Sequence, residues 1–400
     1  MTYRGKLQRN VTLAYITNFL TALIFTIPVW VAFQTRVMDF TQIAFLSALA
    51  YAVRTFLELP TGALADLIGR KKTIMLGWLI CGLANIYISL ASSFIMFFAG
   101  FMAEAIGAVL VSGADTALIY DTFKELNKED YFTKYMARGG FIYRLGLVLA
   151  TFLGGYLYQK WIGLPYFLMG AIQLVAIIFI FLMVEPRIDS EKFTLKSYLG
   201  QTRDGFREIF KTAYMKKLTV YYMFVGGITW SCLYYFNQPF AKNLGYSELE
   251  QSWLFSALYL ATSSLIIYLA SKAGLLSRKT VYLAFPIIMI VSLVPGYFVS
   301  KAIAPILLFG VMLCGSSRFA ILDRYANQEF LSKYRATAVS SLNMLVSIFY
   351  ILVVGASGKI QDVYGTGLIF SLLGLASLLI VLPVGIALVR QDDGSSARAF

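Results

Sequence analysis

The sequence contains no histidine, only three cysteines and few charged residues. Without histidine, the chain has no imidazole for a metal site, a Ser-His-Asp triad or a proton shuttle. The cysteines lie in separate apolar stretches without a C-x-x-C pair, at Cys81, Cys232 and Cys314. We interpret them as small packing residues rather than a disulfide framework or a zinc site. The sequence therefore predicts no metal centre and no enzyme active site of these kinds.

Charged residues make up 14% of the chain and hydrophobic residues 59%, against about 25% and roughly 45–50% in soluble domains. The uncharged runs Thr73–Ala103 and Trp161–Val184 exceed the roughly 20 apolar residues that cross a hydrocarbon core. Continuous apolar runs favour helices, because barrel strands would alternate apolar and polar residues. The sequence predicts an all-α polytopic membrane protein with twelve transmembrane helices, near residues 11–34, 41–65, 73–92, 94–120, 136–158, 162–184, 217–240, 250–271, 280–299, 302–322, 336–357 and 366–389.

The net charge of +13 comes from 34 Lys and Arg residues that are unevenly placed. Only five lie on one set of loops, whereas most lie on the opposite side together with both chain termini. Basic loops mark the cytoplasmic side, so we expect a multi-pass protein of the cell membrane with both termini in the cytoplasm. The charge is expected to meet anionic lipid, and no basic domain for nucleic acid is apparent.

The longest charged interruption divides the chain into two halves of six spans each. We expect one six-helix bundle over 1–185, a cytoplasmic linker over 186–216 and a second bundle over 217–390, followed by a disordered tail over 391–400. Apolar residues recur at helical spacing within 202–214, so the linker is expected to include an interfacial amphipathic helix.

The loop between the second and third spans carries the most specific motif, G-x-x-x-D-x-x-G-R-K. Its residues are Gly62, Asp66, Gly69, Arg70 and Lys71. With twelve spans around it, this motif resembles the major facilitator superfamily. Two bundles joined by a charged linker are also a transporter layout. The resemblance implies the fold of that family, closest in character to its twelve-helix efflux members.

The resemblance also implies a role for this loop as a conformational latch between the two halves. It implies that Asp66 meets the start of the eleventh span and that Arg70 meets an acid at the end of the fourth, for which Asp121 is the candidate. Glycine at 62 permits close helix approach, and glycine at 69 permits a tight reversal. The alternative interpretation is that Arg70, Lys71 and Lys72 are only basic loop charges that orient the protein in the membrane.

The fifth span is similar to the glycine-rich run of antiporters within this family. It reads Gly146-x-x-x-Ala150-Thr151-x-x-Gly154-Gly155. Thr151 replaces the proline of that run, so the kink is not assured. The small residues on one face equally favour tight helix packing alone.

Six charged residues are expected at membrane depth, where each needs a partner, water or a function. Arg54 and Glu58 lie four residues apart and can pair across one turn. Glu104 and Asp115 fall on nearly one face of the fourth span, and we favour Glu104 as a protonatable carboxylate, with Asp115 paired to Arg144. The alternative is that Glu104 is satisfied by neighbouring polar residues.

Arg318 is the lone charge of the second half at membrane depth. It is a candidate ligand for an anionic substrate group. The alternative is a pair with Asp323, which is five residues on and poorly placed on the same helix. Other cavity candidates are polar or aromatic residues, which also commonly face lipid or the membrane interface: Tyr15, Asn18, Phe25, Tyr143, Trp230, Tyr234, Asn237, Gln238 and Asn343.

No Walker A run is present, so ATP-driven transport by this chain alone is disfavoured. We expect a non-enzymatic, monomeric secondary active transporter without a bound cofactor, driven by the proton gradient and exporting small amphipathic or cationic compounds. Proton-coupled uptake of a polar or anionic nutrient is the first alternative. A non-transporting or lipid-handling membrane protein on the same scaffold is the second.

Overall fold

The structure is a computed structural model. It describes the backbone of residues 2–187, 195–271, 277–330 and 334–396. Within these ranges it leaves undescribed the side chains of residues 59–64, 66, 67, 195–199, 201, 270, 271, 319, 320, 336 and 392–396.

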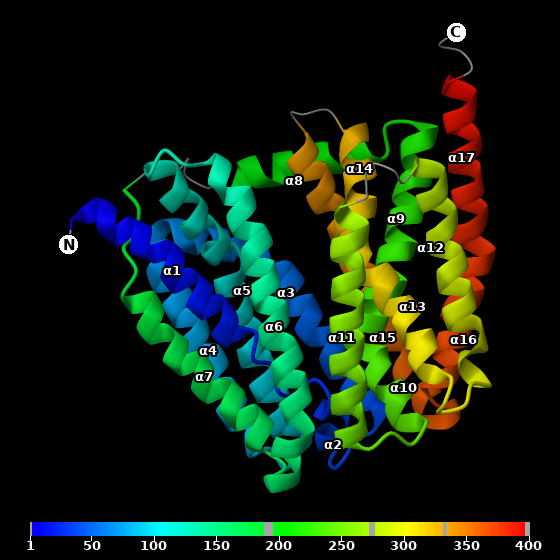
Figure 1. Ribbon diagram of the computed structural model, residues 1–400, viewed down its shortest axis with the longest axis horizontal. Coiled ribbons are helices and arrows are strands. Elements are labelled where there is room, and N and C mark those ends of the chain that lie inside the picture. Colours follow the sequence, from blue (N-terminus) through cyan, green and yellow to red (C-terminus); the bar gives the residue numbers. More distant parts are fainter. Residues whose placement is uncertain (1, 188–194, 272–276, 331–333, 397–400) are drawn as a thin grey trace. The chain divides into compact units, whose positions relative to one another are not determined.

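The described chain consists of helices and connecting turns, without a strand. The all-α fold expected from the uncharged runs is therefore confirmed (Figure 1). The helices of the first half are α1 (Tyr3–Thr21), α2 (Trp30–Gln34), α3 (Phe40–Ile68), α4 (Arg70–Ser89), α5 (Phe94–Glu125), α6 (Asp130–Lys160) and α7 (Leu164–Phe181).

The second half contains three π-helical segments besides its α-helices. Its elements are α8 (Leu195–Ile209), α9 (Ala213–Ser231), the π segment η1 (Cys232–Phe236), α10 (Asn237–Asn243), α11 (Glu248–Ser271), α12 (Arg278–Leu293), the 3-10 segment η3 (Val294–Tyr297), α13 (Ala304–Ser317), the π segment η4 (Arg318–Leu322), α14 (Asp323–Glu329), α15 (Arg335–Tyr364), α16 (Thr366–Ala376), the π segment η5 (Ser377–Val381) and α17 (Leu382–Ser396).

Nine helical stretches of the described residues are long and apolar enough to cross a membrane. The other three expected spans are helical but interrupted or short. A turn separates α1 from α2, η1 separates α9 from α10, and α13 has only 14 residues before η4 begins. All twelve expected segments are thus helical, and twelve crossings stay a prediction.

The chain divides into two compact units. The first contains Met1–Met38, Leu49–Leu195 and Ser247–Ser256, and the second contains Asp39–Ala48, Lys196–Tyr246 and Ala257–Phe400. Consequently α3 and α11 each belong to both units, since each begins in one unit and continues in the other. The predicted bundles, 1–185 and 217–390, assigned each of these helices to one bundle only.

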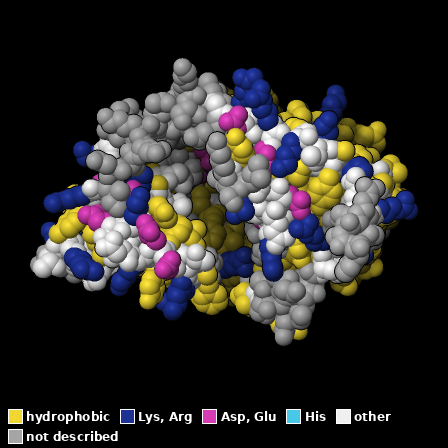
Figure 2. All heavy atoms as spheres, turned by 90° about the horizontal axis from the view of Figure 1, so that it is seen from above, with side chains coloured by type: hydrophobic (Ala, Val, Ile, Leu, Met, Phe, Trp, Pro, Cys, Tyr) yellow, Lys and Arg dark blue, Asp and Glu magenta, His cyan; other side chains and the backbone are white. Residues whose placement is uncertain are grey.

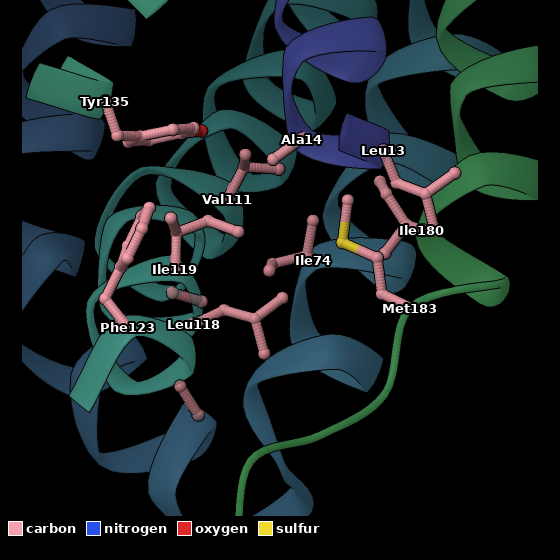
Figure 3. Close-up of a cluster of buried hydrophobic side chains, with 12 residues drawn as sticks. Leu13, Ala14, Ile74, Val111, Leu118, Ile119, Phe123, Tyr135, Ile180 and Met183 are labelled. Atoms are coloured by element: carbon pink, nitrogen blue, oxygen red, sulfur yellow. The ribbon is translucent and has the colours of Figure 1, made fainter. Parts of the chain in front are cut away.

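The core of the first unit lies among α1, α4, α5, α6 and α7. Figure 3 shows its side chains converging from these helices, with Ile74 facing Leu118 and Ile119 and with Tyr135 at the margin. Ser93 precedes helix α5 and caps it, because its hydroxyl accepts a hydrogen bond from the amide of Met96 (3.4 Å). Such a cap satisfies one of the free amides at a helix start.

In the second unit, glycines allow α15 to approach two other helices closely. A Cβ on Gly226 or Gly227 of α9 would meet Val346 or Phe349 of α15. A Cβ on Gly205 of α8 would meet the backbone of α15. The linker helix α8 therefore packs within this unit. It ends at Ile209, short of the expected end at residue 214.

Figure 2 views the structure from above and shows Lys, Arg, Asp and Glu side chains among hydrophobic ones. At the other end of the sequence, α17 continues through Ser396. The tail expected to be disordered from residue 391 is helical as far as that residue, and residues 397–400 lie outside the described chain.

Candidate functional site

Arg54 of α3 forms an ion pair with Glu104 of α5. The two side chains stay 40% and 21% exposed, so the pair lies at an accessible surface of the first unit rather than in its core. The thiol of Cys81 on α4 donates to the backbone carbonyl of Glu104 (3.6 Å). The sequence selected both charged residues but did not pair them, because their contact joins two separate helices.

Asp115 lies further along α5 and is exposed. Its carboxylate interacts electrostatically with the phenol of Tyr135 on α6. The Tyr135 ring lies 5.0 Å from the ring of Tyr15 on α1. Among the described residues, no ion pair joins Asp115 to Arg144. The predicted pairing of these two is therefore wrong. Arg144 is half-buried on α6.

Glu58 lies one turn beyond Arg54 on α3, and its side chain is exposed. Glu58 directly precedes residues 59–64, whose side chains are not described. Its pairing with Arg54 stays a prediction.

Glycines on α6 bring α1 against it. A Cβ on Gly146 would lie 2.9 Å from the Ala22 side chain, and one on Gly154 would meet the Phe25 carbonyl and Pro28. The tight-packing interpretation of this glycine run is thus confirmed. Thr151 is buried and its hydroxyl donates to the Leu147 carbonyl (2.7 Å), a back-bond that bends helices slightly.

Arg70 begins α4 and binds the end of α5. Its guanidinium pairs with Asp121 and donates to the Ala117 carbonyl (2.8 Å). The contact that the family resemblance implied is therefore present. Gly69 adopts φ 95°, the left-handed region that suits glycine, as expected. The side chain of Asp66 and the surroundings of Gly62 lie outside the described residues.

Glu185, which the sequence analysis did not select, caps the start of α4. Its Oε1 accepts from the Arg70 amide (2.7 Å) and its Oε2 from the Lys71 amide (2.9 Å). A carboxylate suits a helix N-terminus, where free amides and the helix dipole concentrate positive charge. One feature of the sequence indicates such a cap: Gly69 precedes α4 and has no side chain to cap it, so an acceptor from elsewhere in the chain is needed.

A second contact ties the N-terminus of the chain to the same region. The Tyr3 hydroxyl donates to Glu125 (3.1 Å) and to the Glu185 carbonyl (3.3 Å), while the Arg187 amide donates to Glu125 (2.8 Å). Burial and the neighbouring Glu125 carboxylate raise the pKa of the Tyr3 phenol. The beginning of the linker is therefore fixed to α1 and α5.

The second unit holds its own charged cluster. Arg318 is 2% exposed and lies over the rings of Tyr222 (5.2 Å) and Trp230 (5.5 Å). The Tyr222 hydroxyl donates to Asp323 (2.5 Å) and also lies 3.5 Å from the Asn343 side-chain oxygen. Arg318 and Asp323 lie at the two ends of a π turn, in which the backbone amide of Asp323 donates to the carbonyl of Arg318. Among the described residues no ion pair joins Arg318 to Asp323, although the two charges interact electrostatically.

A sequence profile described as Major Facilitator Superfamily matches residues 11–240. The chain belongs to this superfamily. It is 25% identical over 372 residues to the uncharacterized MFS-type transporter YxaM of Bacillus subtilis (strain 168), covering 89% of this chain and 88% of that protein. It is 26% identical over 231 residues to Multidrug resistance protein 2 of the same organism, covering 55% and 56%.

The superfamily fold is also evident from solved structures. The nucleoside transporter NupG is 13% identical with a TM-score of 0.76, over 96% of this chain and 99% of that one. At this identity the likeness concerns the fold alone. The protein is therefore a multi-pass MFS transporter, and its substrate and direction of transport are matters for proposal.

Several expected cavity residues of this MFS transporter are instead packed. Phe25 is 5% exposed and belongs to a hydrophobic cluster with Leu23 and Ala150. Asn237 and Gln238 are 1% and 4% exposed in α10. Their burial contradicts their assignment to an open cavity.

The remaining expected cavity residues keep some accessibility. Asn18 is half-buried and donates to the Gly139 carbonyl (3.1 Å), joining α1 to α6. Tyr234 is 57% exposed. The others are partly exposed: Tyr15, Tyr143, Trp230 and Asn343.

Proposed function

We propose that this MFS transporter works by alternating access and couples proton movement to the export of small amphipathic or cationic compounds across the cell membrane. In this proposal both termini face the cytoplasm. The observation that carries it is the ion pair of Arg54 and Glu104, which joins two membrane-embedded helices while both side chains stay partly exposed.

A charge at membrane depth needs a partner or a function. Proton uptake by Glu104 removes one charge of the pair and leaves Arg54 without this counter-ion at membrane depth. The contact between α3 and α5 then weakens, and deprotonation restores it. Such a two-state contact is the kind of element through which a proton can bias a conformational equilibrium.

Asp115 supports the proposed cationic substrate. Asp115 is exposed and interacts electrostatically with Tyr135, whose ring lies 5.0 Å from that of Tyr15 at an angle of 35°. A carboxylate next to aromatic faces attracts a cation by both charge and the ring quadrupole. The likeness to Multidrug resistance protein 2 supports the export of foreign compounds.

Arg70 and Glu185 support a latch at the loop between α3 and α4. The ion pair of Arg70 with Asp121 and the cap from Glu185 fix the start of α4 to α5 and to the segment that follows α7. Asp66 then remains to engage a partner in one conformation and release it in the other.

Arg144 favours the alternative, uptake of a polar or anionic solute. It is a half-buried cation in α6, and a guanidinium binds carboxylate or phosphate groups in a forked geometry. Under this alternative, an anionic solute is accumulated and Arg144→Ala abolishes its uptake.

The test uses proteoliposomes with an imposed pH gradient and ethidium as the transported cation. Wild type moves ethidium against its gradient when the proton gradient is present. Glu104→Gln abolishes the gradient-driven part, whereas Glu129→Gln, at the exposed N-cap of α6, leaves it intact. Full gradient-driven transport by the Glu104→Gln protein would overturn the coupling proposal.

A further inference from the structure

Four residues recur at every fourth position along α9 and η1. Tyr222, Gly226, Trp230 and Tyr234 follow one another at the spacing that aligns residues along one face of a helix. The rings of Trp230 and Tyr234 lie 4.2 Å apart at 32°. Most of α9 is buried, whereas Tyr234 is 57% exposed. The face therefore begins inside the unit and ends at an accessible ring.

The guanidinium of Arg318 lies against this face at Gly226, where no side chain is in its way. A Cβ on Gly226 would lie 2.5 Å from the Nη1 atom of Arg318, so a larger residue would displace the guanidinium. The cation lies 5.2 Å from the Tyr222 ring centroid and 5.5 Å from that of Trp230. Tyr222, Arg318, Trp230 and Tyr234 thus form one column of planar groups, which we call the stacked column.

The buried end of the column is held by hydrogen bonds. Tyr222 donates to Asp323 at 2.5 Å, and Asp323 interacts electrostatically with Arg318. Across the π turn of η4, the backbone amide of Asp323 donates to the carbonyl of Arg318. Segments of π-helix are rare and frequently occur at functional sites. The stacked column is therefore hydrogen-bonded at its buried end, Tyr222, and accessible at its other end, Tyr234.

We propose that Trp230 and Tyr234 form a stacking platform for the planar aromatic ring of a transported compound, and that Arg318 is a positioning residue that holds Trp230 in place. This inference deepens the proposed function, on which it rests, by naming the substrate class. An offset or edge-on pair of aromatic rings contributes binding energy beyond the area that it buries, and an aliphatic cation lacks this contribution. The buried Arg318 acts through the Trp230 ring, because its own side chain is inaccessible.

The test measures equilibrium binding of two permanent monocations to the purified full-length protein in detergent. Ethidium is planar and aromatic, whereas tetrapentylammonium is aliphatic. The readout is the ratio of their dissociation constants in wild type, Trp230→Ala, Tyr234→Ala and Arg318→Lys. Tyr364→Ala is the matched control, since Tyr364 is 58% exposed at the end of α15. Thermal melting of each variant verifies folding.

We expect Trp230→Ala and Tyr234→Ala each to weaken ethidium binding by roughly two- to tenfold, the range of an aromatic pair contact. Tetrapentylammonium binding weakens less, because a quaternary ammonium gains only a cation–π attraction from these rings. Arg318→Lys keeps the charge but loses the flat guanidinium, so it also lowers the preference for ethidium. Tyr364→Ala keeps the wild-type ratio. The accessible Tyr234 tests the platform even if Arg318→Lys fails to fold.

Two outcomes separate this inference from the proposed function. If wild type binds ethidium and the Tyr234→Ala and Trp230→Ala proteins keep the same ratio, the platform is overturned and cation export stands. If wild type binds neither cation, the proposed substrate class is overturned together with the platform. A fall in both affinities by the same factor contradicts stacking, because the platform predicts a larger loss for the planar cation.

Discussion

Glu185 accepts a hydrogen bond from the backbone amide of Arg70, 115 residues earlier in the chain. The acid that follows α7 therefore completes the start of α4. The same residue Arg70 pairs through its guanidinium with Asp121. The start of α4 thus contacts both α5 and the segment that follows α7 in the first unit.

We predict that Glu185→Gln lowers the stability of the protein by about 0.5–2 kcal/mol, the range for loss of a helix N-cap. An amide oxygen accepts a hydrogen bond but lacks the charge that complements the helix dipole. Thermal melting in detergent measures the effect against Glu129→Gln. An unchanged midpoint for Glu185→Gln would show that the cap is dispensable.

For the latch, we predict that Asp121→Asn abolishes most substrate transport while the protein still folds. Removing one partner leaves the Arg70 guanidinium without this acid. The exchange Arg70→Asp with Asp121→Arg restores part of the transport, because the pair can form in the reverse order. A double-mutant cycle of transport rates measures this coupling, and strictly additive effects would exclude it.

The glycine contacts of α6 predict a position-dependent cost. Gly154→Val forces a side chain against the Phe25 carbonyl and Pro28, and such overpacking costs about 1–3 kcal/mol. Gly140→Val on the same helix meets open space, so its melting midpoint falls less. Equal losses for the two variants would argue against close packing of α1 on α6.

The helices could be predicted from the sequence because each depends on local patterns. Runs without charge located the expected spans within several residues, and the motif around Asp66 identified the Arg70 contact with Asp121. The cap from Glu185 was missed, because it joins positions far apart in the chain.

The exceptions in the second unit arise from backbone geometry. An ordinary helix turns 3.6 residues per turn, which separates Arg318 from Asp323, but a π turn links their backbones directly. Nothing in the local residue types marks that turn. Similarly, Asn237 and Gln238 are polar, yet packing around α10 buries them.

The most direct test of the central claim measures proton movement itself. Proteoliposomes filled with a pH-sensitive dye are given ethidium without an imposed gradient, and the change of internal pH is followed. Proton-coupled export through Glu104 predicts a substrate-dependent pH change in wild type that disappears in Glu104→Gln. An equal pH change in both proteins would contradict the account.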